Sequence, residues 1–316
     1  MAEDINQEQL NKVPEGRAVI NKSILRVAAA ALALAVSVLI WYKPTGNKGV
    51  YDNKPNTFMT DSASIRKEVD WVKKNGFNSY CSYGMSDYIS SKPNLVRYLN
   101  LLLRRAGISD LGYIYSNPDF ISKLEKFQKG CANDSMKFSF IISEYEQYQK
   151  DKSRPVFYSM IRTTSTWAHK MGMKSYVYQG HPNLTDVDPI VRYADRVYQH
   201  AYREYDKYGS KVGDDIFGYV DSKLEAYGAS YHKQFPNSKN KFSYMIIYST
   251  EGNPGPPVET KFGYKYFLTH GWGDAHKAFQ NYMMLRKDIP NIKNYTQDSG
   301  YQIFVGSQAK KIKPSK

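Results

Sequence analysis

Residues 110–146 read DLGYIYSNPDFISKLEKFQKGCANDSMKFSFIISEYE, and this stretch holds one full repeat of the pattern that decides the fold. It opens with a β-branched and aromatic run at 110–115 and closes with another at 137–146, each typical of a buried strand. Between them, Asn117-Pro118 is a helix start signal that precedes an amphipathic stretch. A strand, a helix and a second strand in this order predict a βα unit of a parallel sheet.

The same alternation extends on both sides of this unit, from residue 49 to residue 305. Strands are predicted at 49–53, 78–83, 110–115, 137–146, 174–179, 196–203, 241–251 and 300–305. Helices are predicted at 63–75 and 93–105, after residue 118, at 155–170, near 189–194, and at 214–234 and 274–286. This series fits an α/β fold, a single (β/α)8 TIM-type barrel of about 250 residues. An open doubly wound sheet is the alternative, but the chain lacks both GxGxxG after the first strand and GxxxxGK[ST].

The N-terminal region predicts a membrane anchor. Residues 24–42 read ILRVAAAALALAVSVLIWY, an apolar run at the short end of the length that spans a bilayer. Trp41, Tyr42 and Lys43 close it as an interfacial belt. A secretory signal peptide is the alternative, but the preceding region is long and contains acidic residues, and no small-residue cleavage site follows the apolar run.

The whole chain is therefore expected to consist of five parts. They are a polar tail (1–23), a transmembrane signal anchor (24–42), a linker (43–48), the barrel (49–306) and a basic tail (307–316). We expect a single-pass protein whose C-terminal domain lies outside the cytoplasm, on the periplasmic side. The Ala-rich anchor also suits packing against membrane-protein or assembly partners.

The composition is that of a globular protein with excess tyrosine and positive charge. Of 316 residues, 41% are hydrophobic and 23% charged, which excludes a wholly disordered, collagen-like or coiled-coil chain. The 28 tyrosines suit a sugar-binding groove or an interface, or simply Tyr-rich strands. A net charge of +14 favours polyanions, membranes or acidic glycans, and no specific nucleic-acid binding is expected. Cys81 and Cys131 are expected to be unpaired thiols, with one disulfide as the alternative.

Ionisable and polar residues collect at the predicted carboxyl ends of the strands, where active sites lie on this fold. They are Asp52, Glu144, Glu146, Gln179, His200, Tyr202 and Glu251. In the fourth strand, alternate residues of 138–146 share one face that turns from apolar to acidic at its carboxyl end. Beside a low-dielectric core and a second carboxylate, such a carboxylic acid can keep its proton and act as a general acid. A structural network of the two glutamates with Arg203 or nearby lysines is the alternative.

The fourth strand also carries a family resemblance. Residues 138–148, FSFIISEYEQY, resemble the DxxDxDxE motif of family 18 (chitinase-like) glycoside hydrolases, in which the last Glu is the proton donor. The resemblance implies that Glu146 is the donor and that Glu144 takes the position of the preceding acid. Ile142 and Ser139 stand at the two earlier Asp positions.

A second resemblance covers more of the chain. The segment from residue 49 onward is similar to uncharacterised barrel proteins common in Bacteroidetes-type bacteria, with E-x-E on strand four and HAYR on strand six, here at 200–203. This resemblance implies no established activity.

Two further catalytic layouts fit less of the sequence. In the retaining layout of the wider barrel superfamily, Glu144 or Glu146 would be the acid/base and Glu251 the nucleophile. The metal-dependent amidohydrolase layout would use His181 and His200, but it requires an HxH on strand one, where residues 51–53 read YDN. We therefore expect neither a metal nor a cofactor.

The long loop 252–273 is rich in Gly, Pro and aromatic residues, and such loops are often lids or binding loops. The predicted substrate-binding residues are Asp52, Gln179, His200, Tyr202 and Trp272 of this loop. Two functions remain open. One is a membrane-anchored, glycoside-hydrolase-like barrel that acts on or binds envelope or extracellular glycan. The other is a catalytically inactive barrel that serves as an anchored binding or assembly subunit.

Overall fold

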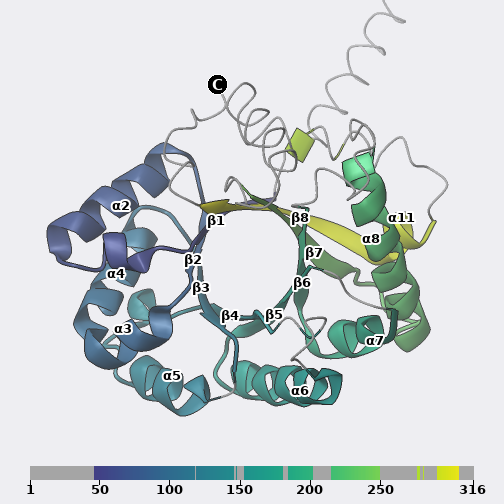
Figure 1. The fold of residues 1–316 in the computed structure, drawn as a ribbon, viewed down its shortest axis with the longest axis horizontal. Coiled ribbons are helices and arrows are strands. Elements are labelled where there is room, and N and C mark those ends of the chain that lie inside the picture. The colour runs from purple at the N-terminus through teal and green to yellow at the C-terminus, as the bar shows by residue number, and fades with distance from the viewer. Residues whose placement is uncertain are drawn as a thin grey trace, which may run out of the picture. The chain divides into compact units, whose positions relative to one another are not determined.

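The chain forms a closed barrel of eight parallel strands in the computed structural model (Figure 1). The structure describes residues 46–117, 119–145, 147, 153–180, 184–201, 215–249, 276–277, 280 and 290–305. The strands follow one another around the barrel in sequence order, and β8 pairs with β1 to close it. Their bounds are β1 Asn47–Asp52, β2 Ser79–Ser82, β3 Asp110–Tyr115, β4 Phe140–Ser143, β5 Lys174–Gln179, β6 Arg196–His200, β7 Phe242–Ser249 and β8 Thr296–Val305.

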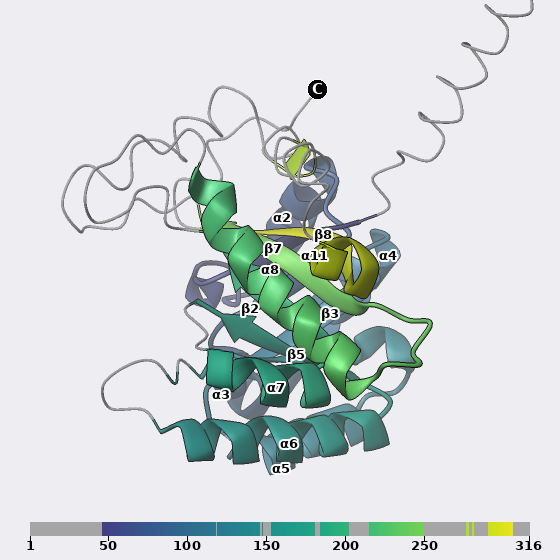
Figure 2. The same ribbon diagram turned by 90° about the vertical axis from the view of Figure 1, so that its right-hand side faces the viewer.

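Helices surround the barrel on its outside (Figure 1). They are α2 Ser62–Lys74, α3 Met85–Ser91, α4 Pro93–Arg105, α5 Phe120–Lys129, α6 Arg154–Lys170, α7 Leu184–Tyr193, α8 Asp215–Gln234 and α11 Pro290–Tyr295, with 3-10 turns η2 Pro55–Thr57 and η3 Asp134–Met136. Helices α6, α7 and α8 pack side by side, as Figure 2 also shows. Because parallel neighbouring strands require a return path, the helices run back from the carboxyl ends to the amino ends of the strands.

Local sequence signals set the ends of these helices. The Asp61 carboxylate caps α2 by accepting hydrogen bonds from the backbone N–H groups of Ala63 and Ser64, both at 2.8 Å. The chain leaves the same helix through Gly76, whose φ of +70° is a left-handed conformation that suits glycine. Pro155 lies in the first turn of α6, where a backbone N–H has no helical acceptor in any case.

Two hydrophobic clusters, one on each face of the strands, form the core. Successive side chains of a strand point to opposite faces. Val50, Val177 and Ile246 belong to the outer cluster, which lies under the helices. The inner cluster fills the barrel and consists of Tyr51, Cys81, Ile114, Phe140, Ile142, Tyr176, Tyr178, Tyr198, Met245 and Ile247. Part of the tyrosine excess is therefore core packing rather than binding surface.

Gly112 on β3 makes room for the ring of Phe140 in the inner cluster. A Cβ atom at Gly112 would lie 2.8 Å from the Cβ of Cys81 and closer still to the Phe140 ring. On its other side, the Phe140 ring packs against Tyr176, with ring centroids 4.7 Å apart. The interior is thus a close-packed core and not a pore.

The predicted α/β barrel is confirmed, and some element boundaries differ. Strand β4 ends at Ser143 rather than at residue 146. Strand β8 begins at Thr296 rather than at residue 300, because its first residues pair with the start of β7 across an irregularity between Tyr244 and Ile246. Helices α3 and α11 were not predicted, since elements of seven and six residues are too short to establish a helical period.

Two predicted elements lie wholly or mostly outside the described residues. They are the membrane anchor at 24–42 and the helix at 274–286. Within the described ranges, no helix is both long enough and apolar enough to cross a membrane. Residues 45–316 form one compact unit, and residues 1–44 are a separate unit.

Candidate functional site

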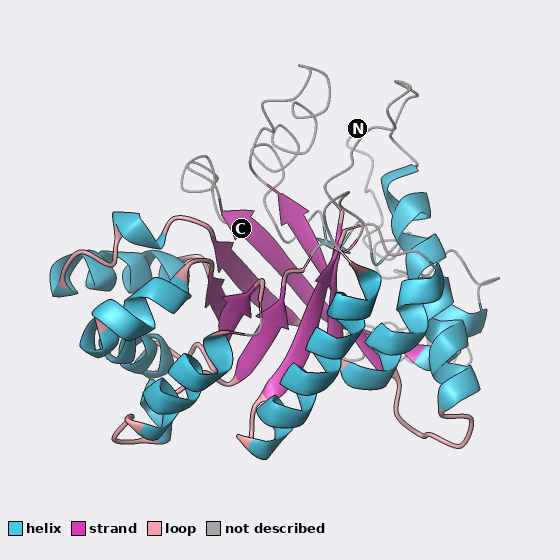
Figure 3. Ribbon diagram, turned by 60° about the horizontal axis from the view of Figure 1, so that its bottom comes forward, coloured by secondary structure: helices cyan, strands magenta, loops and turns pink. Residues whose placement is uncertain are grey.

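All eight strands run in the same direction, so their carboxyl ends meet at one end of the barrel, here called the mouth (Figure 3). Four polar side chains stand at or just beyond this end on the face that lines the barrel interior. They are Tyr51 on β1, Glu144 directly after β4, Tyr178 on β5 and His200 at the end of β6. Loops that follow parallel strands carry the active sites of this fold, so these residues form the candidate site.

Tyr51 and Glu144 meet across the barrel. The Tyr51 hydroxyl donates a hydrogen bond of 2.5 Å to Oε1 of Glu144, although the two residues are 93 positions apart. The backbone N–H of Glu144 is held in turn by the carbonyl of Tyr115, at 2.8 Å. Tyr51 is buried, whereas Glu144 is partly exposed. A donor hydroxyl stabilises the ionised form of a carboxylate, so this contact favours a charged and oriented Glu144.

Tyr178 and His200 form a second polar pair on neighbouring strands. The Tyr178 hydroxyl lies 3.2 Å from Nδ1 of His200, and the two rings are nearly perpendicular. Both side chains are buried. The β4–β5 register pairs Ser143 with Val177, so the next residues in each strand direction, Glu144 and Tyr178, stand at the same level of the barrel. The two pairs therefore lie on adjoining strands of one mouth.

Asp52 and Gln179, both predicted to bind substrate, are placed on the other face of their strands. Asp52 lies two residues after Val50, and Gln179 lies two residues after Val177. Residues two apart in a strand share a face, so both side chains point toward the helix layer, as those of Val50 and Val177 do. Oδ1 of Asp52 accepts from the backbone N–H of Lys54 at 2.7 Å. Gln179 accepts from the Gln147 amide at 2.9 Å. The structure does not bring these two side chains together with Glu144, and a binding role for them stays a prediction.

Other predicted site residues fall outside the described residues: Glu146, His181, Tyr202, Glu251 and Trp272. The expected pairing of Glu144 with Glu146 or Glu251 at one cleft therefore remains a prediction. Of the predicted residues that are described, Glu144 and His200 lie at the inner face of the mouth.

Sequence reasoning missed Tyr51 and Tyr178. Each stands directly before a residue that was predicted, Asp52 and Gln179, and each was grouped with the general tyrosine excess. Alternation along a strand was the available signal, because either residue of each pair had to face the interior. Which one does so is a property of the closed barrel.

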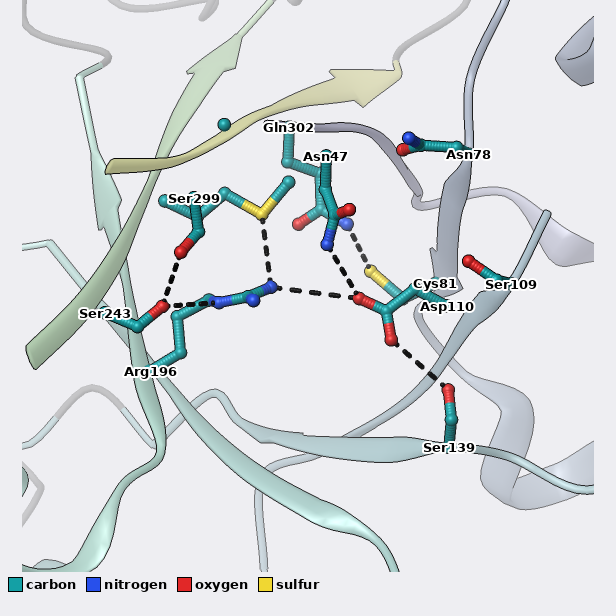
Figure 4. Close-up of polar contacts among 12 residues, drawn as sticks. Asn47, Asn78, Cys81, Ser109, Asp110, Ser139, Arg196, Ser243, Ser299 and Gln302 are labelled. Atoms are coloured by element: carbon teal, nitrogen blue, oxygen red, sulfur yellow. Dashed lines mark hydrogen bonds and ion pairs between the residues drawn. The ribbon is translucent and has the colours of Figure 1, made fainter. Parts of the chain in front are cut away.

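A second polar cluster fills the opposite, amino end of the barrel (Figure 4). Arg196 of β6 lies 3.8 Å from Oδ2 of Asp110 on β3, and its Nε donates to Oγ of Ser243 at 2.9 Å. Asn47 donates to the same Oδ2 at 3.0 Å, and Ser139 donates to Oδ1 at 3.4 Å. The amino end of the strands serves stability rather than chemistry in barrels, and the internally satisfied contacts fit that role.

Burial dominates the titration of Asp110 in this amino-end cluster. It raises the pKa of Asp110 above its ordinary value, even though Arg196 acts in the opposite direction. The guanidinium of Arg196 also lies over the Tyr176 ring, 4.7 Å from its centroid. The cluster is thus a neutralised cross-link between β3 and β6.

The described residues offer no metal site and no disulfide. In these ranges, no three His, Cys, Asp or Glu side chains come together as metal ligands. Cys81 and Cys131 are free thiols. Burial raises the pKa of Cys81 well above its ordinary value, and its Sγ accepts a hydrogen bond from the Gln302 amide at 3.0 Å. Cys81 is therefore a packed, protonated core residue.

Comparison with known proteins identifies no family. No family model matches the chain, and no curated protein matches it. The resemblances to family 18 hydrolases and to Bacteroidetes-type barrels therefore stay predictions.

Among solved structures, the chain is similar to other barrels. The YdjI aldolase from Escherichia coli K12 has 6% identity and a TM-score of 0.44, over 84% of this chain and 76% of that chain. A D-psicose 3-epimerase from Clostridium cellulolyticum H10 has 11% identity and a TM-score of 0.43, over 82% and 86%. A chitinase from Chromobacterium violaceum has 12% identity and a TM-score of 0.35, over 65% and 68%. At these values the likenesses carry no argument about reaction or substrate, and the barrel assignment rests on the strand topology of this chain.

Proposed function

We propose that this protein is a membrane-anchored barrel that hydrolyses an envelope or extracellular glycan at its mouth. Glu146 is the general acid, and Glu144 is the ionised carboxylate that orients the substrate and stabilises positive charge. The observation that carries the proposal is the 2.5 Å hydrogen bond from Tyr51 to Glu144 at the carboxyl end of the strands.

The chemistry of glycoside hydrolysis requires two carboxyl groups in different protonation states. The Tyr51 hydroxyl favours the charged state of Glu144 by donating to it. The proton then belongs on a second acid nearby, and Glu146 is two residues further along the same chain. Glu251, two residues beyond the end of β7 in the sequence, is the alternative second carboxylate.

Aromatic rings around Glu144 support a sugar as the ligand. Phe304, which is partly buried, lies beside Tyr51 with ring centroids 5.2 Å apart. Tyr178 stands level with Glu144 on the neighbouring strand. A sugar presents an apolar ring face together with hydroxyl groups, and tyrosine offers both a flat face and a hydrogen-bonding group.

The test uses four variants and a panel of chitin, peptidoglycan and acidic polysaccharide fragments. Glu146→Gln should lower turnover by roughly 100-fold or more, because general acid catalysis is lost while the shape is kept. Glu144→Gln should have a comparable effect. Tyr51→Phe should lower kcat by roughly 10- to 100-fold, the value of one hydrogen bond to a charged group. Glu225→Gln, at an exposed position of α8, is the matched control and should keep full activity.

The pH profile separates a positioning role of Tyr51 from a merely structural one. Loss of the donor makes Glu144 harder to ionise, so the acidic limb of the kcat profile should move to higher pH in Tyr51→Phe. Thermal melts should show that all variants remain folded. If the wild-type protein cleaves none of the panel, the catalytic proposal fails, and the glycan-binding or assembly-subunit function takes its place.

A further inference from the structure

One end of the barrel carries a ring of basic side chains. The helices that lead into a strand end at the amino end of the barrel, because each finishes shortly before the next strand begins. Basic residues occupy the last turns of these helices. They are Lys73, Lys74, Arg104, Arg105, Lys126, Lys129, His169, Lys170, Arg192, His232, Lys233 and Lys293. We call these residues, together with Lys137, Lys174, Lys239 and Lys241, the basic rim.

The loops at the same end extend the ring. Lys137, Lys239 and Lys241 lie between a helix and the strand that follows it, and Lys174 is the first residue of β5. Lys239 and Lys241 also line an open hollow beside the starts of β7 and β8. Cations at helix C-termini stabilise the helix dipole, and that effect explains the last-turn residues. It does not explain the loop lysines, which belong to no helix.

Acidic residues at this end neutralise only part of the rim. Lys129 lies 2.5 Å from Glu125, Lys137 lies 2.8 Å from Asp134, and Lys233 lies 3.6 Å from Asp188. His169 and Lys174 lie 2.8 Å and 3.9 Å from the same carboxylate, that of Asp195. At the centre of the ring, Arg196 and Asp110 neutralise each other. In contrast, the side chains of Lys73, Lys74, Arg105 and Lys170 are exposed to solvent. The amino end thus has a neutral centre and a positive border.

The chain enters the barrel at this same end. Strand β1 begins at Asn47, and its first residues pair with Gly300 and Tyr301 of β8. The apolar run at 24–42 ends only five residues before Asn47 in the sequence, a span of at most about 18 Å when fully extended. A membrane-spanning segment there keeps the start of β1 close to a bilayer surface.

We propose that the basic rim docks on an anionic lipid surface and turns the mouth of the barrel away from the bilayer. Lysine and arginine near an anionic membrane gain electrostatic energy that fades within about one Debye length, roughly 8–10 Å. A ring built from the ends of many helices can bring several charges within that range at once. The inference rests on the membrane-anchored part of the proposed function and not on its catalytic part.

The test measures lipid binding without the anchor. Residues 45–316 form one compact unit that contains the closed barrel and both hydrophobic clusters, so this part can be purified alone. Its binding to phosphatidylcholine vesicles is compared with binding to vesicles that also contain phosphatidylglycerol, by co-sedimentation at low and high salt. Binding should require the anionic lipid and should weaken at high salt.

Two variants with equal loss of charge locate the contact. The rim variant Lys73→Gln/Lys74→Gln/Arg105→Gln/Lys170→Gln should bind anionic vesicles roughly 10-fold more weakly or worse. The control Lys54→Gln/Lys67→Gln/Lys123→Gln/Arg162→Gln neutralises exposed residues away from the rim and should change binding by less than about 3-fold. The pairs Lys73→Gln/Lys74→Gln and Arg105→Gln/Lys170→Gln should each give part of the loss, which keeps the test valid if the fourfold rim variant folds poorly.

Several results would overturn the inference. One is an absence of wild-type binding to anionic vesicles, and another is an equal loss in the rim and control variants, which indicates net charge alone. Rim-dependent binding that is tighter to heparin fragments or to DNA than to vesicles would assign the rim to a soluble polyanion. Glycan turnover by the same protein is measured separately, so failure of docking and failure of catalysis remain distinguishable.

Discussion

Replacing Gly112 with alanine should destabilise the barrel from its inside. The new methyl group would lie 2.8 Å from the Cβ of Cys81 and closer still to the ring of Phe140, whereas ordinary carbon contacts are about 3.5–4 Å. The backbone of Gly112 needs no left-handed conformation, so the effect comes from packing alone. The Phe140 ring cannot retreat easily, since it is fully buried and packs against Tyr176.

The expected size follows from this confinement. Overpacking in a well-filled core costs typically 1–3 kcal/mol, and the lack of room around Phe140 places Gly112→Ala at about 2–3 kcal/mol. The measurement is the free energy of unfolding in urea. A matched control is Gly130→Ala, where the nearest atom to the new methyl is the flexible guanidinium end of Arg97, 2.6 Å away. That variant should stay within about 0.5 kcal/mol of wild type.

A double-mutant cycle tests the cause. Phe140→Leu alone should cost about 1–2 kcal/mol through lost burial. With the smaller side chain, the alanine methyl has space, so the double variant should be about as stable as Phe140→Leu alone. The coupling between the two sites should therefore be about 2 kcal/mol. A Gly112→Ala protein as stable as wild type, or strictly additive costs in the double variant, would refute the packing argument.

Three further predictions concern charge, closure and the anchor. Burial raises the pKa of Asp110, so the folded protein binds the proton of this carboxyl group more tightly than the unfolded chain does. The stability that this proton binding contributes is lost as the pH rises from about 4, the pKa in the unfolded chain, through the raised pKa of the folded state. In urea titrations over this range, wild type should lose stability more steeply than Asp110→Asn, and equal slopes would contradict the assignment. Deletion of residues 300–305 removes every residue of β8 that pairs with β1 and exposes two strand edges, so the product should be insoluble or melt without cooperativity. A cooperatively melting product would argue against a need for closure. The full chain should remain with membranes after carbonate washing because of residues 24–42, and a soluble product whose N-terminus maps just beyond them would oppose the anchor.

The order of elements and the position of the acidic strand end were accessible from the sequence. The alternation of apolar runs with amphipathic helices, the Asn-Pro helix start and the glycine stops are local signals, and they predict parallel strands joined by helices. Parallel strands share a carboxyl end, so the sequence alone assigns Glu144 and His200 to one end of the barrel. Short elements such as α3 are not predicted from the sequence, because seven residues contain too few helical turns to show a period.

Only the tertiary structure decided which side chains meet at the mouth. Strands buried on both faces carry apolar and aromatic residues on both faces, so Val50 and Tyr51, or Val177 and Tyr178, give no sign of which one faces the interior. The contact of Tyr51 with Glu144, and that of Asp110 with Arg196, join residues far apart in the chain and depend on the stagger of the closed barrel. That stagger is set by the pairing of all eight strands together, and no single segment of the sequence contains it.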